Sequence, residues 1–549
     1  MVTRTSAESR DHQRLTATPA ATAPVALLAV AVAAAAVLKW TAYVVLGRGL
    51  NLFETGTTIV GGLRLLSGQM PYVDFFAFYG PLTYLFPGLA AKAAGSVTTA
   101  DFVLDLLVGT ASAVVAYLVA TRLSRRPVLA LLAPLILLLL GANTARTLPA
   151  LLSVLLLIRA ERTGRRIWLF VAGAAGGVGL LWIQDAGAWI CVAVLVTALG
   201  GLVLPAARRV LSAGRFMVYA AGVAAALVPW ITFCIVRGSL GAWIHWTFVF
   251  PLTRYTERSS TAYLETLFGS AMDAGALRGL YILAFWVLPF VAIFLAAAIA
   301  VVIALMWVWR AWRSESGSVG VAAPVSFLVL AVYGLLQLRV LAASIDEAKL
   351  IDSAAPTIVA AVVLVLASVP SRDRIDSTPT AVRVAAIVLA AWLVVWPAWW
   401  QGRLVTEAIG EPGPQASEAV GGLPFTAAAP PLTTPAGLDE VVRVIHQHTG
   451  PDDPILVLPT SPLLYAIADR TNPTGYDYLD PVYTTPEVDA AIAAALRDGE
   501  VAVVVLGDND FPGSAFTGRE IAPETYSAID TLYTEVAEVE GFTVLARLP

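Results

Sequence analysis

Charged residues are scarce in this sequence. Asp, Glu, Lys and Arg make up 13% of the 549 residues, whereas about a quarter of a typical soluble domain is charged. Apolar residues make up 58%, and the mean hydropathy is +0.76. These values exclude a soluble globular protein. They predict a polypeptide that crosses a membrane many times.

Cysteine, histidine and lysine are also rare. Cys191 and Cys234 both lie in apolar segments, which excludes a disulfide framework and a thiolate metal site. P-loop, dinucleotide-binding and nucleophile-elbow motifs are absent, so no nucleotide cofactor is expected. The 3 Lys against 32 Arg indicate a GC-rich bacterial genome. The four histidines form no zinc-binding pattern: His12, His245, His446 and His448.

The charges that are present divide the chain in two. Residues 1–403 contain 30 Lys and Arg against 17 Asp and Glu, whereas residues 404–549 contain 5 against 22. The first part therefore carries +13 and the tail −17. Such a difference indicates separate domains in separate surroundings. No basic stripe with interleaved aromatic residues lies outside the apolar part, so a nucleic-acid partner is not expected.

The apolar part predicts a transmembrane domain over residues 23–403. Residues 1–22 are polar and indicate a disordered cytoplasmic N-terminus, and the first apolar run is too long for a cleaved signal sequence. A window of about 20 residues gives eleven spans, with nine to thirteen as the range. The spans are 23–46, 98–121, 127–142, 146–159, 167–183, 186–205, 216–236, 279–307, 321–338, 354–370 and 381–400.

The distribution of basic residues predicts the orientation of these spans. With the N-terminus in the cytoplasm, the inside segments contain 18 Lys and Arg and the outside loops 11, as the positive-inside rule requires. An odd number of spans then places the acidic tail outside. We therefore expect a multi-pass protein of the plasma (inner) membrane with an extracytoplasmic C-terminal domain.

The tail has the pattern of a small α/β domain. Residues 404–435 are rich in Pro, Gly and Ala and indicate a linker. Residues 436–549 then alternate helical and strand patterns. Helices are predicted at 438–446, 462–468, 487–497 and 524–537, and strands at 455–458, 501–506 and 542–547. The predicted fold class is a polytopic α-helical membrane protein of about eleven transmembrane helices with this extracytoplasmic α/β domain.

The first outside loop, residues 48–87, contains two acids in an apolar and aromatic setting. Glu54 follows Phe53, and Asp74 lies between Tyr72 and Phe75. A carboxyl group beside aromatic rings at a membrane surface is partly desolvated, which suits general acid–base chemistry. The alternative is that acids are simply tolerated in a loop outside the membrane.

The same loop resembles the first loop of GT-C fold glycosyltransferases, the family of protein O-mannosyltransferases and lipid A aminoarabinose transferases. The resemblance rests on Glu54 just after the first span, on Gly56 and the pair at 61–62, and on the motifs PYVDF (71–75) and YGPL (79–82). It is strongest over about residues 20–190. It implies transfer of a sugar from a polyprenyl-phosphate donor to a glycan, glycolipid or protein acceptor on the outer face.

By this resemblance, Glu54 is the general base that activates the acceptor hydroxyl. Many relatives have an acidic pair where this chain has Phe53 and Glu54, which leaves Asp74 as a competitor for the role or as an orienting group. A divalent cation is left open by the resemblance, and no residue is assigned as a metal ligand.

A phosphate leaving group requires cations near the outer membrane surface, because negative charge develops on it as the glycosidic bond breaks. Arginine binds phosphate oxygens bidentately. The alternative for each cation is an interfacial side chain that reaches toward the lipid headgroups. The candidates are Arg146, Arg254, Arg258, Arg339 and Lys349.

Four further residues are candidates for substrate binding. Tyr72 and Tyr79 lie in the first-loop motifs, Asp185 lies at the outer end of two spans, and His245 lies between two tryptophans. Aromatic rings stack on sugar faces, but they also line membrane interfaces in general. An acid at membrane depth is costly and usually functional, although a tight outer turn would expose Asp185 to headgroups.

Two other functions fit the sequence less well. A transporter or flippase would show broken spans in corresponding halves and ionisable residues near the membrane midplane. Here polar residues gather at the outer ends and a globular tail follows. The missing acidic pair also leaves open a catalytically inactive GT-C relative that acts in envelope assembly.

Overall fold

A computed structural model describes most of the chain. The described residues are 23–45, 51–140, 146–253, 279–281, 283–313, 321–342, 347–368, 395–396, 398–399, 438–507, 517–539 and 541–549. The predicted N-terminal segment (1–22), the linker (404–435) and nearly all of the last predicted span (381–400) lie outside these residues, so those predictions stay predictions.

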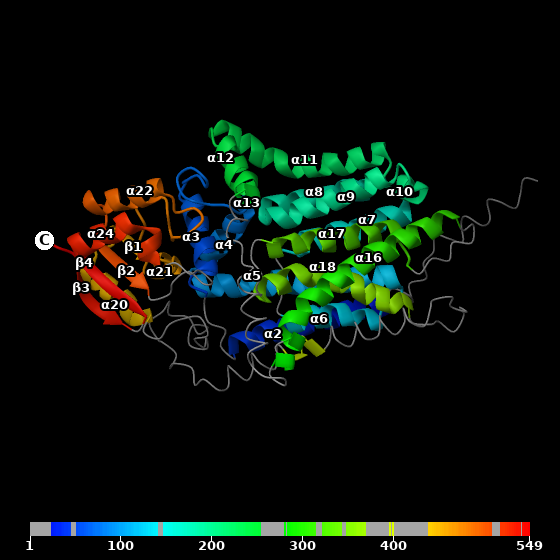
Figure 1. Ribbon diagram of the computed structural model, residues 1–549, viewed down its shortest axis with the longest axis horizontal. Coiled ribbons are helices and arrows are strands. Elements are labelled where there is room, and N and C mark those ends of the chain that lie inside the picture. The colour runs from blue at the N-terminus through cyan, green and yellow to red at the C-terminus, as the bar shows by residue number, and fades with distance from the viewer. Residues whose placement is uncertain are drawn as a thin grey trace, which may run out of the picture.

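Long apolar helices form a bundle that makes up one end of an elongated molecule, and the C-terminal domain makes up the other (Figure 1). Every predicted span within the described residues coincides with a helix. These helices are α2 (Ala23–Val45), α5 (Val97–Ser124), α6 (Leu132–Leu140, after the 3-10 turn η2, Leu129–Leu131), α7 (Leu148–Thr163), α8 (Arg166–Trp182), α9 (Gln184–Gly200), α11 (Ala213–Val236), α16 (Leu288–Arg313), α17 (Pro324–Gln337) and α18 (Glu347–Ser368).

By length and composition, three of the described helices can cross a membrane: 99–124, 213–236 and 288–313. Six shorter apolar helices accompany them. With the composition of the chain, these helices make it a membrane-embedded protein. The count of eleven spans stays a prediction.

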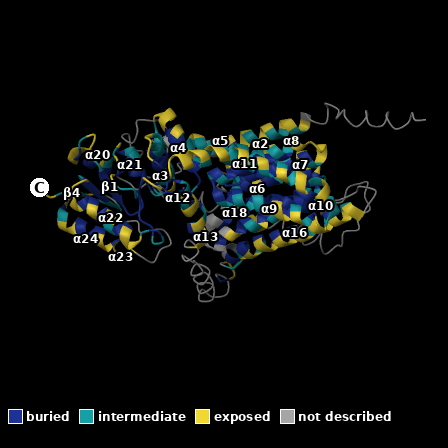
Figure 2. Cartoon of the chain, turned by 90° about the horizontal axis from the view of Figure 1, so that it is seen from above, coloured by how far each residue is buried: buried dark blue, intermediate teal, exposed yellow. Residues whose placement is uncertain are grey.

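Helix α16 shows how the bundle separates its buried and lipid-facing sides. Val291, Leu295 and Val302 are 56%, 57% and 57% exposed, whereas Ile293 and Ala300 are fully buried. Residues spaced by three, four or seven positions share one face of a helix. Figure 2 shows the same division over the bundle, with buried residues inside and exposed ones outside.

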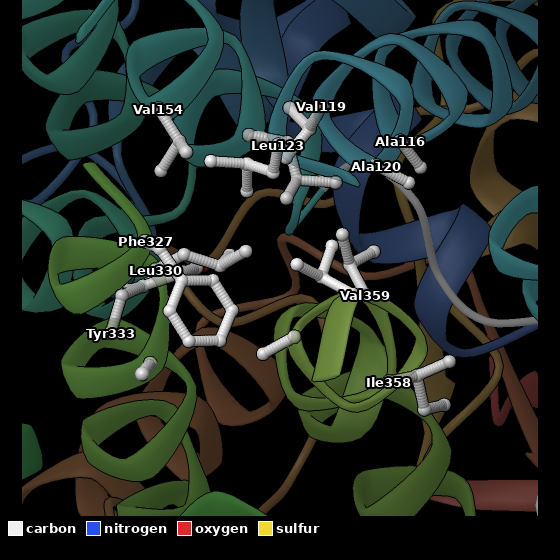
Figure 3. Packing of buried hydrophobic residues seen from close by; sticks show 14 of the residues in the cluster. Ala116, Val119, Ala120, Leu123, Val154, Phe327, Leu330, Tyr333, Ile358 and Val359 are labelled. Carbon is white, nitrogen blue, oxygen red and sulfur yellow. The ribbon is translucent and has the colours of Figure 1, made fainter. Parts of the chain in front are cut away.

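The core of the bundle is formed where α5, α7, α17 and α18 pack together. Figure 3 shows side chains from all four helices meeting in one apolar layer. Leu123, Val154, Phe327 and Val359 are each completely buried in this core. Burial of this kind holds α17 and α18 in place.

A single residue, Ile183, separates α8 from α9. This tight turn requires glycine at position 187, where an added Cβ would lie 2.1 Å from the backbone nitrogen of Leu180. It places Gln184 and Asp185 in the first turn of α9, at the predicted outer end of the bundle.

The first outside loop is largely helical, which sequence analysis missed. Helix α3 spans Glu54–Leu66 and α4 spans Pro81–Ala94. They cross closely, because an added Cβ on Gly62 would lie 2.2 Å from the carbonyl oxygen of Tyr84. Further short elements are α10 (Pro205–Val210), α12 (Leu240–Ile244), the π-helical turns η3 (His245–Val249) and η5 (Leu283–Val287), α13 (Phe250–Thr253) and the 3-10 turn η6 (Leu338–Ala342).

The C-terminal domain contains a four-stranded sheet in the order β1-β2-β4-β3, in which β1 and β2 are parallel and the other pairs antiparallel. Ile455 pairs with Val503, and Val505 with Val544. Apolar cores lie on both faces of the sheet. The elements are α20 (Leu438–His448), β1 (Ile455–Leu458), α21 (Leu463–Ile467), α22 (Pro486–Arg497), β2 (Val503–Gly507), α23 (Gly518–Ile521), α24 (Pro523–Leu532), β3 (Tyr533–Val539) and β4 (Phe542–Arg547).

One prediction for the tail was wrong. The expected helix 524–537 ends at Leu532, and residues 533–539 form the edge strand β3. Leu532, Val536 and Val539 are spaced by four and three residues, which mimics a helical pattern. Pairing with β4 overrides that local pattern.

Candidate functional site

Glu54 is the first residue of α3, at the junction between the first loop and the C-terminal domain. The side-chain oxygen of Asn51 accepts hydrogen bonds from the backbone N–H groups of Phe53 and Glu54, at 3.0 and 2.8 Å, which fixes the start of the helix. The Leu463 N–H of α21 donates to the Leu52 carbonyl at 3.1 Å. The carboxylate of Glu54 itself is exposed, so the protein alone does not provide the desolvation expected from its aromatic neighbours.

Asp74 closes a turn in the same loop. Its carboxylate accepts a hydrogen bond from the Met70 N–H at 2.6 Å, and its own N–H donates to the Met70 carbonyl at 2.8 Å. The following residues touch the tail, since the Phe76 N–H donates to the Gly475 carbonyl at 2.7 Å. Asp74 is exposed like Glu54, but one of its oxygens already has a structural partner.

A buried ion pair joins the far end of α3 to the C-terminal domain. The Arg64 guanidinium lies 2.6 Å from the Asp477 carboxylate, and the two side chains are 10% and 8% exposed. Arg64 also donates to the carbonyls of Asn472 and Thr474 and to the side chain of Gln69. This pair could not be predicted, because nothing in the local sequence relates positions so far apart.

The two ends of α3 are therefore both attached to the tail. In its first turn, an added Cβ on Gly56 would lie 2.3 Å from the backbone nitrogen of Leu463. Leu52 and Val60 belong to the same apolar core as β1 and β2. Figure 1 shows α3 beside the sheet domain, between it and the bundle. The helix that carries Glu54 is thus part of the tail's core.

A second group of predicted residues meets at the outer end of the bundle. The Arg146 guanidinium lies 2.8 Å from the Asp185 carboxylate and 3.5 Å from the Tyr79 hydroxyl. The Arg146 side chain is 9% exposed and that of Asp185 is 26% exposed. The acid is therefore the more accessible member of the pair, and it neutralises the charge of the arginine behind it.

The segment that carries Tyr79 is held by residues that sequence analysis did not single out. Gln184 donates to the Phe78 carbonyl at 2.8 Å and accepts from the Gly80 N–H at 3.3 Å. The Tyr84 hydroxyl accepts from the N–H groups of Phe78 and Tyr79 at 3.2 and 3.3 Å. No motif marks these roles, because a glutamine or tyrosine that binds backbone has no fixed spacing to its partner.

The side chain of Tyr72 is buried and hydrogen-bonded within the first loop. Tyr72 is 5% exposed, adopts a φ of 72°, and donates its hydroxyl to the Tyr79 carbonyl at 2.7 Å. The first-loop motifs around Tyr72 and Tyr79 therefore form one hydrogen-bonded unit beside Arg146.

An aromatic cluster lies where the first loop, the tail and η3–α13 meet. Phe76 stacks on Tyr483 with ring centroids 3.8 Å apart, and Trp246 meets Phe76 edge-on at 5.2 Å. Burial raises the pKa of the Tyr483 hydroxyl well above its usual range, so this group stays protonated and donates to the Tyr478 carbonyl. His245 is exposed beside Trp246, with ring centroids 5.0 Å apart.

The remaining predicted cations are separate from these groups or lie outside the described part of the chain. Arg339 is exposed in η6. Lys349 lies in the first turn of α18, and the placement of its side chain is not described. Arg254 and Arg258 fall in residues 254–278, outside the described residues. Among the residues that are described, no three His, Cys, Asp or Glu side chains are grouped to hold a metal ion.

These observations define a membrane protein with the GT-C fold. No family model and no curated protein matches the sequence. The chain is similar to the crystal structure of ArnT from Cupriavidus metallidurans bound to undecaprenyl phosphate, with a TM-score of 0.50 and 18% identity over 94% of this chain and 98% of that one.

Two further solved structures are similar at a lower level. One is ArnT from the same organism in the apo state, with a TM-score of 0.43 and 16% identity over 96% of this chain and 98% of that chain. The other is the arabinofuranosyltransferase AftD from Mycobacteria, with a TM-score of 0.45 and 16% identity over 95% of this chain but 40% of that chain. The fold assignment rests on the ArnT complex.

Proposed function

We propose that the protein is a membrane glycosyltransferase that transfers a sugar from a polyprenyl-phosphate donor to an acceptor on the extracytoplasmic face. The observation that carries this proposal is the similarity to ArnT bound to undecaprenyl phosphate along nearly the whole of both chains. The position of an exposed acid, Glu54, at the junction of the first loop and the tail supports it.

In this proposal the acceptor hydroxyl attacks the anomeric carbon of the donor sugar. The bond from that carbon to the phosphate oxygen breaks, and its electron pair leaves with the polyprenyl phosphate. The hydroxyl proton passes to the Glu54 carboxylate, which acts as the general base. Cations near the phosphate stabilise the charge that develops on it. By the resemblance to the family, the anomeric configuration inverts.

The hydrogen bonds of the two acids favour Glu54 over Asp74 as the base. An Asp74 oxygen holds the Met70 N–H in a turn, so protonation of that oxygen would disturb the loop. At the start of α3, the backbone N–H of Glu54 makes the hydrogen bond to Asn51. Its carboxylate therefore stays available for proton transfer. We assign Asp74 to shaping the loop against Gly475 of the tail.

The candidate cations fall into two groups in this proposal. Arg146 lies behind Asp185, so an anionic phosphate would approach the acid before it reached the arginine. We therefore assign the Arg146–Asp185 pair to the sugar. We assign binding of the donor phosphate to Arg339, which is exposed, and to Arg254, Arg258 and Lys349.

The test is transfer of a radiolabelled sugar from a panel of polyprenyl-phosphate donors to cell-envelope acceptors by the purified protein. We expect product from the parent and a loss of about 10²-fold or more with Glu54→Gln, the range of general-base catalysis. The control is Glu500→Gln, at an exposed acid of the tail, which should retain parental activity.

Each alternative result has a definite meaning. If Asp74→Asn abolishes transfer in a folded protein while Glu54→Gln does not, the enzyme class stands and the base is Asp74. If no donor supports transfer, while the parent binds polyprenyl phosphate, the transferase proposal fails. A flippase or an inactive relative in envelope assembly would then account for the fold.

A further inference from the structure

The inner ends of α5 and α7 and the start of α8 lie on the side of the bundle away from the C-terminal domain. Val97, at the start of α5, packs against the core of that domain, so the other end of this 28-residue helix lies about 40 Å away. Helix α7 starts beside the Arg146–Asp185 pair at the outer end, so it ends on the same inner side. The predicted topology places this side in the cytoplasm.

Hydrogen bonds bring the ends of α5 and α7 to one place. The Leu123 carbonyl, near the end of α5, accepts from the Ala322 N–H at 2.9 Å. The Glu161 carboxylate, near the end of α7, accepts from the N–H groups of Val325 and Ser326 at 3.2 and 2.8 Å. Because residues 322 and 325 are close in sequence, the residues that flank Leu123 and Glu161 are neighbours in space.

Exposed arginines gather around this point. The Arg159 guanidinium lies 3.8 Å from the centre of the Trp168 ring, which joins α7 to α8. Partial burial and the nearby charges of Arg122 and Arg125 lower the pKa of Arg162, which lies beyond the predicted span 146–159. We define the inner arginine cluster as the six exposed residues Arg122, Arg125, Arg159, Arg162, Arg165 and Arg166.

Within the described part of the chain, little negative charge balances this cluster. None of its six members forms an ion pair with a described acid. The acid within the same segment, Glu161, already accepts three hydrogen bonds at the start of α17, the third from the Ser326 hydroxyl at 2.6 Å. Like charges that are held together without counter-charges favour the binding of an anion.

The surface beside the cluster is apolar and exposed. Val128, shortly after the end of α5, is 66% exposed, and Ile167, next to Arg166, is 56% exposed. Arg159 and the exposed Leu152 are seven positions apart and share a face of α7. Exposed apolar residues of a membrane bundle face the lipid tails, which places the arginines at the level of the headgroups. The cluster is therefore positioned for a lipid.

We propose that the inner arginine cluster binds the headgroup of an anionic phospholipid in the adjoining membrane leaflet, and that it favours a headgroup with two phosphates, as in cardiolipin. Arginine donates to two phosphate oxygens at once, and a phosphodiester has only its two non-bridging oxygens to accept such bonds. One phosphate therefore engages fewer arginines than the cluster provides. The site lies at the opposite end of the bundle from Glu54, and the inference is independent of the proposed function.

Lipid binding is measured by native mass spectrometry on the full-length protein, purified in a neutral detergent. The probes are cardiolipin, phosphatidylglycerol with one phosphate, and phosphatidylethanolamine without net charge. We expect cardiolipin to bind at least about tenfold more tightly than phosphatidylethanolamine, and at least about threefold more tightly than phosphatidylglycerol at equal phosphate concentration. Both preferences should weaken as the ionic strength rises from about 0.05 to about 0.5 M, because salt screens exposed charges.

The triple variant Arg122→Gln/Arg125→Gln/Arg162→Gln removes half of the cluster. We expect it to lower the affinity for cardiolipin at least about tenfold and to leave the affinity for phosphatidylethanolamine unchanged. Its melting temperature without anionic lipid should stay the same or rise, because the substitutions remove charges that repel one another. A variant that binds cardiolipin as the parent does would overturn the site.

A matched control removes the same charge elsewhere on the inner side. Arg208→Gln/Arg209→Gln/Arg310→Gln changes exposed arginines of α10 and α16, and it should change the affinity for cardiolipin by less than about twofold, since distant exposed charges are screened. An equal loss in both triple variants would overturn the site, because total charge would then determine binding.

A charge-conserving variant separates recognition by the guanidinium from attraction alone. Arg122→Lys/Arg125→Lys/Arg162→Lys keeps the charge but loses the planar fork. We expect its affinity for cardiolipin to approach that for phosphatidylglycerol at equal phosphate. An undiminished preference for cardiolipin in this variant, or equal affinity of the parent for the two lipids, would overturn the two-phosphate headgroup. Binding of soluble polyglutamate as tight as that of cardiolipin would instead assign the cluster to an acidic protein.

Discussion

Arg64 and Asp477 are 413 positions apart in the sequence and form a buried ion pair at 2.6 Å. The pair connects the end of α3 to the segment between α21 and α22. Removal of one partner leaves an uncompensated buried charge, whereas removal of both can be nearly neutral. The pair is therefore a sensitive point for the attachment of the tail to the first loop.

We predict that Arg64→Met or Asp477→Leu lowers the stability of the attached tail by about 3–5 kcal/mol. The double variant Arg64→Met/Asp477→Leu should be less damaged than either single one. Thermal unfolding and limited proteolysis of the purified protein measure this. The exposed pair Arg519–Asp530 is the control, since its loss should cost at most about 1 kcal/mol. An equal loss of stability on substitution at Arg64–Asp477 and at Arg519–Asp530 would show that the Arg64–Asp477 pair is not buried in solution.

The Arg146–Asp185 pair should respond unequally to substitution of its two members. Arg146→Met leaves a partly buried carboxylate without its partner, and Asp185→Asn leaves a more deeply buried guanidinium that retains a neutral acceptor. We expect Arg146→Met to lower the melting temperature more than Asp185→Asn. The exchanged variant Arg146→Asp/Asp185→Arg should recover part of the loss. A larger loss in the exchanged variant than in both single variants would contradict a direct pairwise interaction.

The crossing of α3 and α4 predicts a strong effect of a single methyl group. An added Cβ at Gly62 meets the Tyr84 carbonyl at 2.2 Å, so Gly62→Ala must separate the two helices. We expect a loss of about 1–3 kcal/mol from overpacking, measured by thermal unfolding. Gly214→Ala in α11, where an added Cβ has no neighbour within 4 Å, should be neutral or slightly stabilising.

The turn before α24 should be sensitive to acid. The N–H and hydroxyl groups of Thr517 donate to the Glu520 carboxylate, and these bonds hold the pKa of Glu520 below its usual range. A carboxyl group whose pKa is lower in the folded state stabilises that state above its unfolded pKa of about 4.3. The stabilisation is lost as the pH falls through the folded pKa.

We therefore expect amide exchange in α23 to accelerate as the pH falls from about 5 to about 3, after correction for the intrinsic rate. Glu520→Gln should flatten this dependence, because the amide side chain does not titrate. A pH dependence that persists in the Glu520→Gln variant would assign it to another group, such as Asp530, whose pKa the hydrogen bond from Arg519 also lowers.

The bundle and most of the tail could be predicted from the sequence, because apolar length and periodicity reflect burial directly. The strands 455–458 and 542–547 agree with β1 and β4 residue for residue. Helices α3 and α4 were missed because they lie beside the membrane domain, contain glycines where the backbones cross, and have no long apolar run. The β3 segment was misassigned because pairing with β4 decides its structure, and local spacing does not report that pairing.

The candidate site was predictable in part. Composition and motif position indicated Glu54, Tyr79, Arg146 and Asp185, and the last three do meet in space. Arg64 and Gln184 could not be predicted, because their roles depend on partners in distant segments.

The attachment of α3 to the tail also affects how the protein is made. Ribosomes release the chain from the N-terminus, and domains generally fold as they emerge. The first-loop helix emerges early, but the Leu463 N–H and the Asp477 carboxylate that hold it belong to the last hundred or so residues and, in the predicted topology, must first cross the membrane. The helix with Glu54 therefore gains these contacts only when the tail has been synthesised, and a chain truncated before Leu463 would lack both of them.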